Sequence, residues 1–415
     1  MRSFIALALL FAAPLAPAGA EDAHWIGSWG AAPLQPAPAF GPFPASPSFS
    51  HQTIRQVMRI SAGGARLRLR LSNEYGAKPL EIGAASIAHA TSYGMPDTKP
   101  IAVTFGGKKS ATIPPGAPLA SDPVDLATKD LDTISVSLYV SGDTGPCTCH
   151  ATGLEDGFVS DTGDFTKKDF QPKDRITSRA FLSGISVETA KPAKTIIVLG
   201  DSISDGVGST KGANRRWPDL LAQRLSQRSD GNEWGVVNAG ISGNQILNDG
   251  AGQSALARFD RDVLAVPGAA YLIVFEGIND IGISYGNFNM PRPAPGTAGG
   301  PLPPKPHVTA DQLIAGYQQI IARAHGRGLK VIGATITPYK GAAYYAAEGE
   351  KVREKVNDWI RKSAAFDAVI DFDKVIRDPK DPQVIADGLH MGDHLHGSDA
   401  GYEAMADSID LSIFR

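Results

Sequence analysis

The sequence lacks three features that would each have pointed to a particular class of protein. Only two of its 415 residues are cysteine, which leaves room for at most one disulfide within the chain. The net charge of -3 is too small to indicate nucleic acid or an anionic membrane as a partner. Beyond the N-terminus no apolar stretch approaches the roughly 18 residues of a membrane-spanning helix. The expected partner is therefore a soluble substrate or polymer.

The two cysteines, Cys147 and Cys149, are separated by a single residue. In an extended strand, residues i and i+2 lie near the upper limit of disulfide reach, so a bond would need a kink in the chain. An oxidising compartment would favour such a bond. A strained disulfide, two free thiols and a metal site all stay open, and none of them bears on the main function.

The N-terminus has the pattern of a secretory signal peptide. Arg2 supplies a positive start, residues 4–16 form an apolar run too short to span a bilayer, and small residues before Glu21 form a cleavage site. We therefore expect residues 1–20 to be removed on export. The mature protein should be periplasmic or extracellular.

Residues 21–187 have the pattern of an all-β domain, a jelly-roll-like sandwich. Short alternating runs recur at about ten-residue spacing, separated by Gly, Pro, Asn and Asp. Residues 66–71 alternate strictly, which predicts a strand with leucines inward and arginines toward water. Together with residues 56–60 and the Gly-Gly turn between them, this strand is typical of a β-hairpin.

Residues 188–194 have the composition of a linker, and residues 195–415 have the pattern of an α/β domain. Apolar runs alternate there with helical segments, which predicts a parallel five-stranded, flavodoxin-like sheet flanked by helices. One helix should begin after His307, where Thr309 and Gln312 form a capping box. The strands are expected at residues 196–199, 236–237, 271–275, 331–334 and 368–370.

The first of these strands ends at Gly-Asp-Ser, which places Ser202 at the carboxyl end of a buried strand. A serine becomes a nucleophile when an imidazole oriented by a carboxylate takes its proton. Asp393 and His396 are three residues apart and can supply that pair across one turn of chain. Asp387 and His390 have the same spacing, so His390 is the main competitor for the role of the base.

Attack on an ester carbonyl also requires hydrogen-bond donors for the oxyanion. Each donor stabilises the transition state by about 3–4 kcal/mol. Two loops that follow parallel strands carry candidates. Gly243 allows a backbone N–H to approach closely, and the side-chain amide of Asn279 is a donor. Both loops are expected at the same edge of the sheet as Ser202.

Four short motifs follow one another along the C-terminal half: GDSIS at 200–204, NAGISGN at 238–244, GIND at 277–280 and DHLHGSDAGY at 393–402. Together they resemble blocks I, II, III and V of the SGNH superfamily of GDSL-type esterases and lipases. Any one block alone is weak evidence for the family, but the four blocks in this order are highly specific for it. The resemblance covers the chain from Lys194 to its end.

This resemblance implies a role for each residue of the site. Ser202 is the nucleophile, His396 the base and Asp393 the residue that orients the base. The backbone N–H groups of Ser202 and Gly243 and the side chain of Asn279 form the oxyanion hole.

The last block contains one ambiguity and one departure. The family's histidine precedes a Gly-Tyr pair by about five residues, which fits His396 and Gly401 better than His390. Gly397 stands where the family often has proline, a position that shapes the loop and carries no reacting atom.

The N-terminal half is similar to a bacterial exported subgroup in which a β-sandwich precedes the SGNH domain. The resemblance rests on residues 25–29, 68–76 and 150–153. Two-domain carbohydrate esterases likewise join a jelly roll to an SGNH domain, so polysaccharide acyl groups are a reasonable substrate class. His150, in the last of these segments, is expected to be a hydrogen-bonded structural histidine, with a minor role in substrate contact left open.

Residues 285–306 are rich in Gly and Pro and too long for an ordinary loop after a strand. They leave the sheet on the same edge as Ser202. We expect an active-site wall or lid that decides the acyl length, with a surface insertion as the alternative.

The sequence therefore predicts a secreted serine ester hydrolase that acts through an acyl-enzyme on short acyl esters, above all acetyl esters and including those of carbohydrates. It should need no cofactor or metal, bind no nucleic acid and have no stable membrane insertion; the oligomeric state is left open. A lipase with the same residues is the alternative. Two other classes compete: a glycan-binding protein with a degenerate hydrolase domain, and a metal site. The metal site would use Asp387, His390, Asp393, His394 and His396.

Overall fold

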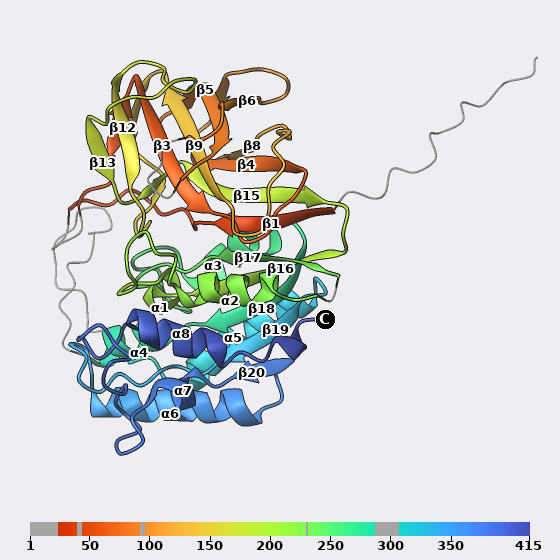
Figure 1. Cartoon of the computed structure of the whole chain (residues 1–415). Helices are drawn as coiled ribbons and strands as arrows, with labels where there is room; N and C mark the ends of the chain where they lie inside the picture. The colour runs from red at the N-terminus through yellow and green to blue at the C-terminus, as the bar shows by residue number, and fades with distance from the viewer. Residues whose placement is uncertain (1–23, 40–43, 92–95, 230, 287–306) are drawn as a thin grey trace, which may run out of the picture.

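The computed structural model describes residues 24–39, 44–91, 96–229, 231–286 and 307–415. Antiparallel sheets form the N-terminal half, and a helix-covered parallel sheet forms the C-terminal half stacked against it (Figure 1). The predicted signal peptide, residues 1–20, lies outside the described residues. So do residues 287–306, which make up nearly all of the predicted lid.

The N-terminal half is an all-β sandwich, as predicted. Its larger sheet has the order β13-β12-β3-β9-β5-β6, with β7 also paired to β5, and its smaller sheet has the order β1-β15-β4-β8. Apolar side chains of both sheets share one buried core. The strands are β1 (His24–Gly30), β2 (Ser48–Ser50), β3 (Gln52–Arg59), β4 (Arg66–Ser72), β5 (Leu80–His89), β6 (Ile101–Val103), β7 (Ala111–Ile113), β8 (Pro118–Ala120), β9 (Thr133–Val140), β10 (Asp143–Pro146), β11 (Cys149–His150), β12 (Gly157–Thr162), β13 (Asp174–Ile176), β14 (Arg179–Ala180) and β15 (Leu182–Thr189).

The predicted hairpin between residues 56–60 and 66–71 is wrong. β3 pairs with β9 and β12 in the larger sheet, whereas β4 pairs with β15 and β8 in the smaller one. The two glycines between them allow close backbone approach, because a Cβ on Gly63 or Gly64 would collide with the carbonyl oxygen of Thr128 or Glu188. The leucines of β4 are buried and its arginines are half-exposed. The alternation therefore predicted the faces of the strand correctly, but not its neighbours.

Cys147 and Cys149 form a disulfide, with their Cα atoms 5.4 Å apart. The bond lies where β10 ends and β11 begins. The two cysteines are therefore not in one extended strand, and the chain departs from extended geometry between them, as a bond at this spacing needs.

The C-terminal half confirms the predicted SGNH-type sheet. Its five strands are all parallel, in the order β17-β16-β18-β19-β20. These strands are β16 (Ala193–Gly200), β17 (Glu233–Asn238), β18 (Ala269–Phe275), β19 (Lys330–Ala334) and β20 (Ala368–Ile370). The helices are α1 (Ser202–Asp205), α2 (Trp217–Ser226), α3 (Ala255–Phe259), the π-helical turn η1 (Asp260–Leu264), α4 (Ile278–Tyr285), α5 (Ala310–His325), α6 (Ala347–Lys362), α7 (Phe372–Ile376), α8 (Asp399–Asp407) and the 3-10 turn η2 (Leu411–Ile413).

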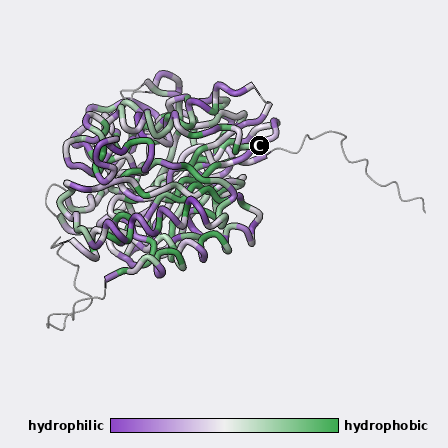
Figure 2. The backbone as a smooth tube through the Cα atoms, turned by 90° about the horizontal axis from the view of Figure 1, so that it is seen from below, coloured by the Kyte–Doolittle hydropathy of each residue, from purple (hydrophilic) through white to green (hydrophobic). Residues whose placement is uncertain are grey.

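Local signals in this half are also confirmed. Thr309 and Gln312 cap α5 reciprocally, as predicted, and the helix buries one apolar face. Figure 2 shows hydrophobic segments gathered in the interior of the molecule. In the described part of the chain, no helix has the length and apolar character needed to cross a membrane.

The two halves meet where β1 packs against β17 (Figure 1). The backbones approach so closely that a Cβ on Gly235 would collide with the carbonyl oxygen of Gly27. The Gly27 N–H donates to the Thr195 hydroxyl at 2.9 Å. The sandwich is thus joined directly to the two strands, β16 and β17, that lead to the site.

Candidate active site

Ser202 lies at the turn between β16 and α1. The Asp201 side chain caps α1 by accepting from the Ile203 N–H at 2.9 Å, and Gly206 ends the helix with φ +95°. Gly200 has no space for a side chain, because a Cβ there would collide with the Ser204 hydroxyl. This tight turn fixes the Ser202 hydroxyl at the carboxyl edge of the sheet, where it is 6% exposed.

The structure brings Ser202, His396 and Asp393 together. His396 Nε2 lies 2.8 Å from Ser202 Oγ, and His396 Nδ1 lies 2.6 Å from Asp393 Oδ2. The other carboxylate oxygen, Asp393 Oδ1, accepts from the N–H groups of Leu395 and His396, both at 3.0 Å. With the Nδ1 proton directed at a carboxylate, Nε2 is left to accept the serine proton.

The environment keeps Asp393 ionised. Burial alone would raise its pKa, but hydrogen bonds from the His396 ring and from the backbone N–H groups of His396 and Leu395 lower the pKa to about 2. The carboxylate is therefore present throughout the neutral range, as the orientation of an imidazole requires.

His390, the competing candidate for the base, has a different place. Its Nδ1 accepts from the backbone N–H groups of Gly392 at 3.0 Å and His394 at 3.3 Å, and its ring lies against that of His394. His390 thus organises the loop that carries His396. No group of three or more His, Cys, Asp or Glu residues in the described ranges has the arrangement of metal ligands.

The predicted oxyanion donors lie on loops that contact each other. Asn279 donates from its amide to the Asn244 carbonyl at 3.0 Å and accepts from the Tyr344 hydroxyl at 3.4 Å. The second N–H of this amide has no acceptor in the described part of the chain, and neither does the backbone N–H of Ser202 or Gly243. These three donors have no partner among the described residues, as the donors of an oxyanion hole require.

Arg258 supports this arrangement and was not found from the sequence. It is fully buried and donates to Asn244 Oδ1 at 2.9 Å, to the Ala239 carbonyl at 2.6 Å and to the Gly200 carbonyl at 3.2 Å. It therefore ties the nucleophile turn to the oxyanion loop. In the sequence, its role is indicated only by the i,i+4 spacing of Arg258 and Asp262. The same spacing is typical of ion pairs on many surface helices, so it does not indicate a buried residue.

Asp280, the last residue of the GIND motif, also positions the oxyanion loop. Its two oxygens accept from the N–H groups of Ile246 at 2.8 Å and Leu247 at 3.0 Å. Burial raises its pKa to about 7 despite these hydrogen bonds. In this motif, only the role of Asn279 was predicted from the sequence.

A serine-histidine-aspartate relay at the carboxyl edge of a parallel, helix-flanked sheet defines a serine hydrolase of the SGNH type. Residues 198–404 match the family model for the GDSL-like Lipase/Acylhydrolase family. Through its C-terminal domain the chain therefore belongs to the GDSL-like lipase/acylhydrolase family, and it is a carboxylic ester hydrolase. No curated protein matches the sequence.

Several solved structures resemble the C-terminal half. A GDSL-like lipase from Bacteroides thetaiotaomicron VPI-5482 is 16% identical, with a TM-score of 0.39, over 53% of this chain and 87% of that one. A member of the lipolytic protein G-D-S-L family from Veillonella parvula DSM 2008 is 19% identical, with a TM-score of 0.38, over 53% and 98%. An acetyl xylan esterase is 22% identical, with a TM-score of 0.38, over 52% and 96%. At these identities and TM-scores the likeness carries no argument about the substrate.

Proposed function

We propose that the protein is an exported serine ester hydrolase that cleaves short acyl esters, above all acetyl esters of carbohydrates, through an acyl-enzyme. The observation that carries this proposal is the continuous relay from Ser202 Oγ through His396 to Asp393, with contacts of 2.8 and 2.6 Å. A competent residue fills each position, which disfavours a degenerate scaffold that only binds glycans.

In the proposed reaction Ser202 Oγ attacks the ester carbonyl while His396 Nε2 takes its proton. The Asp393 carboxylate stabilises the imidazolium that forms. The oxyanion receives hydrogen bonds from the N–H groups of Ser202 and Gly243 and from the Asn279 amide. His396 then protonates the leaving alcohol, water attacks the acyl-enzyme with His396 again as base, and the acid leaves. No step uses a cofactor or metal.

The resemblance to two-domain carbohydrate esterases supports both the short acyl group and the carbohydrate as the alcohol part of the substrate. Within the site, the buried Tyr344 hydroxyl donates to Asn279 Oδ1 at 3.4 Å and so helps to orient the amide.

Export is supported by two separate features. The N-terminus has the signal-peptide pattern, and Cys147 and Cys149 form a disulfide, a bond that persists in oxidising compartments.

Initial rates against p-nitrophenyl esters from acetate to palmitate, together with acetate release from acetylated xylan, test the proposal. We expect the rate to fall steeply beyond butyrate, acetate to appear from the polymer, and Ser202→Ala to lose nearly all activity. Rates that hold or rise with chain length would replace the short-acyl proposal with the lipase alternative. Full activity of Ser202→Ala would refute the mechanism itself.

A further inference from the structure

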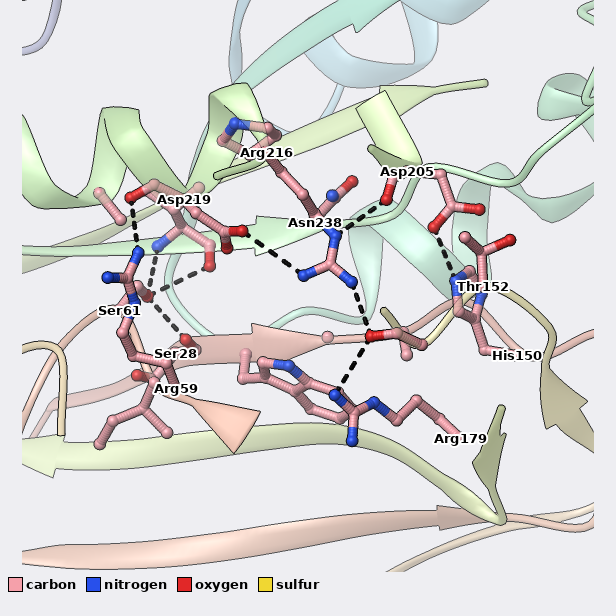
Figure 3. Close-up of a pocket in the computed structure, with 18 of the residues that line it drawn as sticks. Ser28, Arg59, Ser61, His150, Thr152, Arg179, Asp205, Arg216, Asp219 and Asn238 are labelled. Atoms are coloured by element: carbon pink, nitrogen blue, oxygen red, sulfur yellow. Dashed lines mark hydrogen bonds and ion pairs between the residues drawn. The ribbon is translucent and has the colours of Figure 1, made fainter. Parts of the chain in front are cut away.

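The β-sandwich reaches the catalytic half through a short segment that begins at His150, the last residue of β11. The His150 ring is buried, with Nδ1 2.9 Å from the Ala32 carbonyl oxygen and Nε2 2.8 Å from Asp205 Oδ1 (Figure 3). Asp205 is the last residue of α1, the helix that begins with Ser202. A residue of the N-terminal half thus holds the helix that carries the nucleophile.

The His150 ring is held at both nitrogens, because one faces the Ala32 carbonyl oxygen and the other faces the Asp205 carboxylate. Burial alone would raise the pKa of Asp205, but the charge and hydrogen bond of His150 and the hydroxyl of Ser242 lower it. The two side chains are 6% and 4% exposed, so solvent offers neither of them a replacement for this contact.

The second oxygen of Asp205 holds the oxyanion loop. Asp205 Oδ2 accepts from the Ser242 N–H at 3.0 Å and from the Ser242 hydroxyl at 2.7 Å. The same hydroxyl lies 3.1 Å from the Thr152 hydroxyl, which again belongs to the sandwich. Ser242 directly precedes Gly243, whose φ of +81° turns the loop. Asp205 therefore connects the sandwich to the proposed oxyanion donor.

Arginines of both halves fix the same segment. The Gly153 carbonyl accepts from Arg216 Nη2 at 2.8 Å and from Arg179 Nη2 at 3.2 Å. Arg216 Nε also donates to the Asp205 carbonyl at 2.9 Å. Figure 3 shows these residues converging where the two halves meet. The position of His150 is thus determined from both sides of the interface.

We propose that His150 is a positioning residue of the active site, which acts through Asp205 and Ser242 to hold the Gly243 N–H where the oxyanion develops. The β-sandwich thereby completes the oxyanion hole of the neighbouring domain. The inference rests on the proposed function, since it requires that Gly243 donates to the oxyanion. Without His150, Oδ1 of the buried Asp205 would lose the hydrogen-bond partner that the described residues give it. The hold of Asp205 on Ser242 would then weaken, because the carboxylate must protonate or move toward water.

The test compares His150→Ala, His150→Gln and Ser242→Ala with a matched control, Ser61→Ala. Ser61 is also buried at the interface, where its hydroxyl accepts from the Val236 N–H at 2.8 Å and donates to the Ser28 carbonyl at 2.6 Å. It contacts neither Asp205 nor the oxyanion loop. The measurements are kcat and KM on p-nitrophenyl acetate, the inhibition constant of phenylboronic acid, which forms a tetrahedral adduct, and the thermal midpoint.

For His150→Ala we expect kcat to fall about 100-fold with KM little changed, because a displaced donor weakens the transition state selectively. Phenylboronic acid should bind correspondingly more weakly. His150→Gln keeps a donor toward Asp205 and should retain more activity. Ser242→Ala should lower kcat about tenfold, and its combination with His150→Ala should lose less than the product of the two single losses. Ser61→Ala should lower the thermal midpoint and leave kcat unchanged.

Unchanged kcat in folded His150 variants would overturn the inference, as would a Ser61→Ala variant that loses kcat to the same extent. If neither His150 variant folds, Ser242→Ala decides, and wild-type kcat in that variant contradicts the inference. Failure of the proposed function looks different. In that case the wild type would not hydrolyse the ester, or Ser202→Ala would hydrolyse it equally well.

Discussion

Replacing Asp393 by asparagine should abolish the base without displacing it. Asp393 Oδ1 accepts from the backbone N–H groups of Leu395 and His396, both at 3.0 Å, and only the oxygen of an amide can replace it there. The amide NH2 must then face His396 Nδ1, where Asp393 Oδ2 lies at 2.6 Å. Nδ1 becomes an acceptor, so the ring proton moves to Nε2. That nitrogen lies 2.8 Å from Ser202 Oγ and could no longer accept the serine proton.

The expected loss follows from this change of tautomer. The same substitution in serine proteases lowers kcat about 10⁴-fold, which corresponds to about 5.4 kcal/mol of transition-state stabilisation. Alanine removes more atoms, yet it leaves the imidazole free to take either tautomer. Asp393→Ala should therefore be no less active than Asp393→Asn. If the number of atoms removed decided the loss, the alanine variant would be the less active of the two.

The assay is the initial rate on p-nitrophenyl acetate at pH 7, with thermal unfolding as a check that each variant is folded. An Asp393→Asn enzyme within tenfold of wild type would refute the argument from the backbone hydrogen bonds. So would an alanine variant far less active than the asparagine variant.

Three further predictions concern other parts of the catalytic half. Arg258→Met leaves the buried Glu276 without its cation, whereas Asp262 keeps Arg261. The substitution also removes the donors to the Gly200 and Ala239 carbonyls, and it should lower the free energy of unfolding by about 3–5 kcal/mol in urea at pH 7; a loss below about 1 kcal/mol would contradict this. Asn279→Ala should lower kcat about 10²–10³-fold with little change in KM, and a change confined to KM would remove Asn279 from the oxyanion hole. Burial raises the pKa of Asp367, but the Val331 N–H, Lys330 and His325 outweigh it and lower the pKa to about 2. Asp367 should thus stabilise the fold above about pH 4 and lose this effect as the pH falls toward 2, so the difference in unfolding free energy from Asp367→Asn should shrink over that range; a constant difference would contradict the ion pairing.

The elements that local chemistry determines were predictable. The unbroken apolar runs of β16 and β18 match buried parallel strands, and the Thr309–Gln312 capping box forms as expected. The relay of Ser202, His396 and Asp393 was also predictable from the sequence, because Asp393 and His396 lie within one turn of chain and the serine follows the end of a strand.

Contacts between distant residues with no motif of their own were not predictable. Arg258 binds the carbonyl group of Gly200, the last residue of β16, and that of Ala239, which directly follows β17. His150 and Asp205 are 55 residues apart and belong to different halves, so they meet through the packing of the two halves against each other. The wrong hairpin has the same origin, since alternation determines the faces of a strand and carries no information about its partner.

The most direct test of the central claim is to label the enzyme with an organophosphonate and map the modified peptide by mass spectrometry. We expect one adduct per chain, on Ser202, formed in step with the loss of esterase activity and absent from Ser202→Ala. Inactivation with the adduct on another residue, or complete labelling of Ser202 with activity retained, would contradict it.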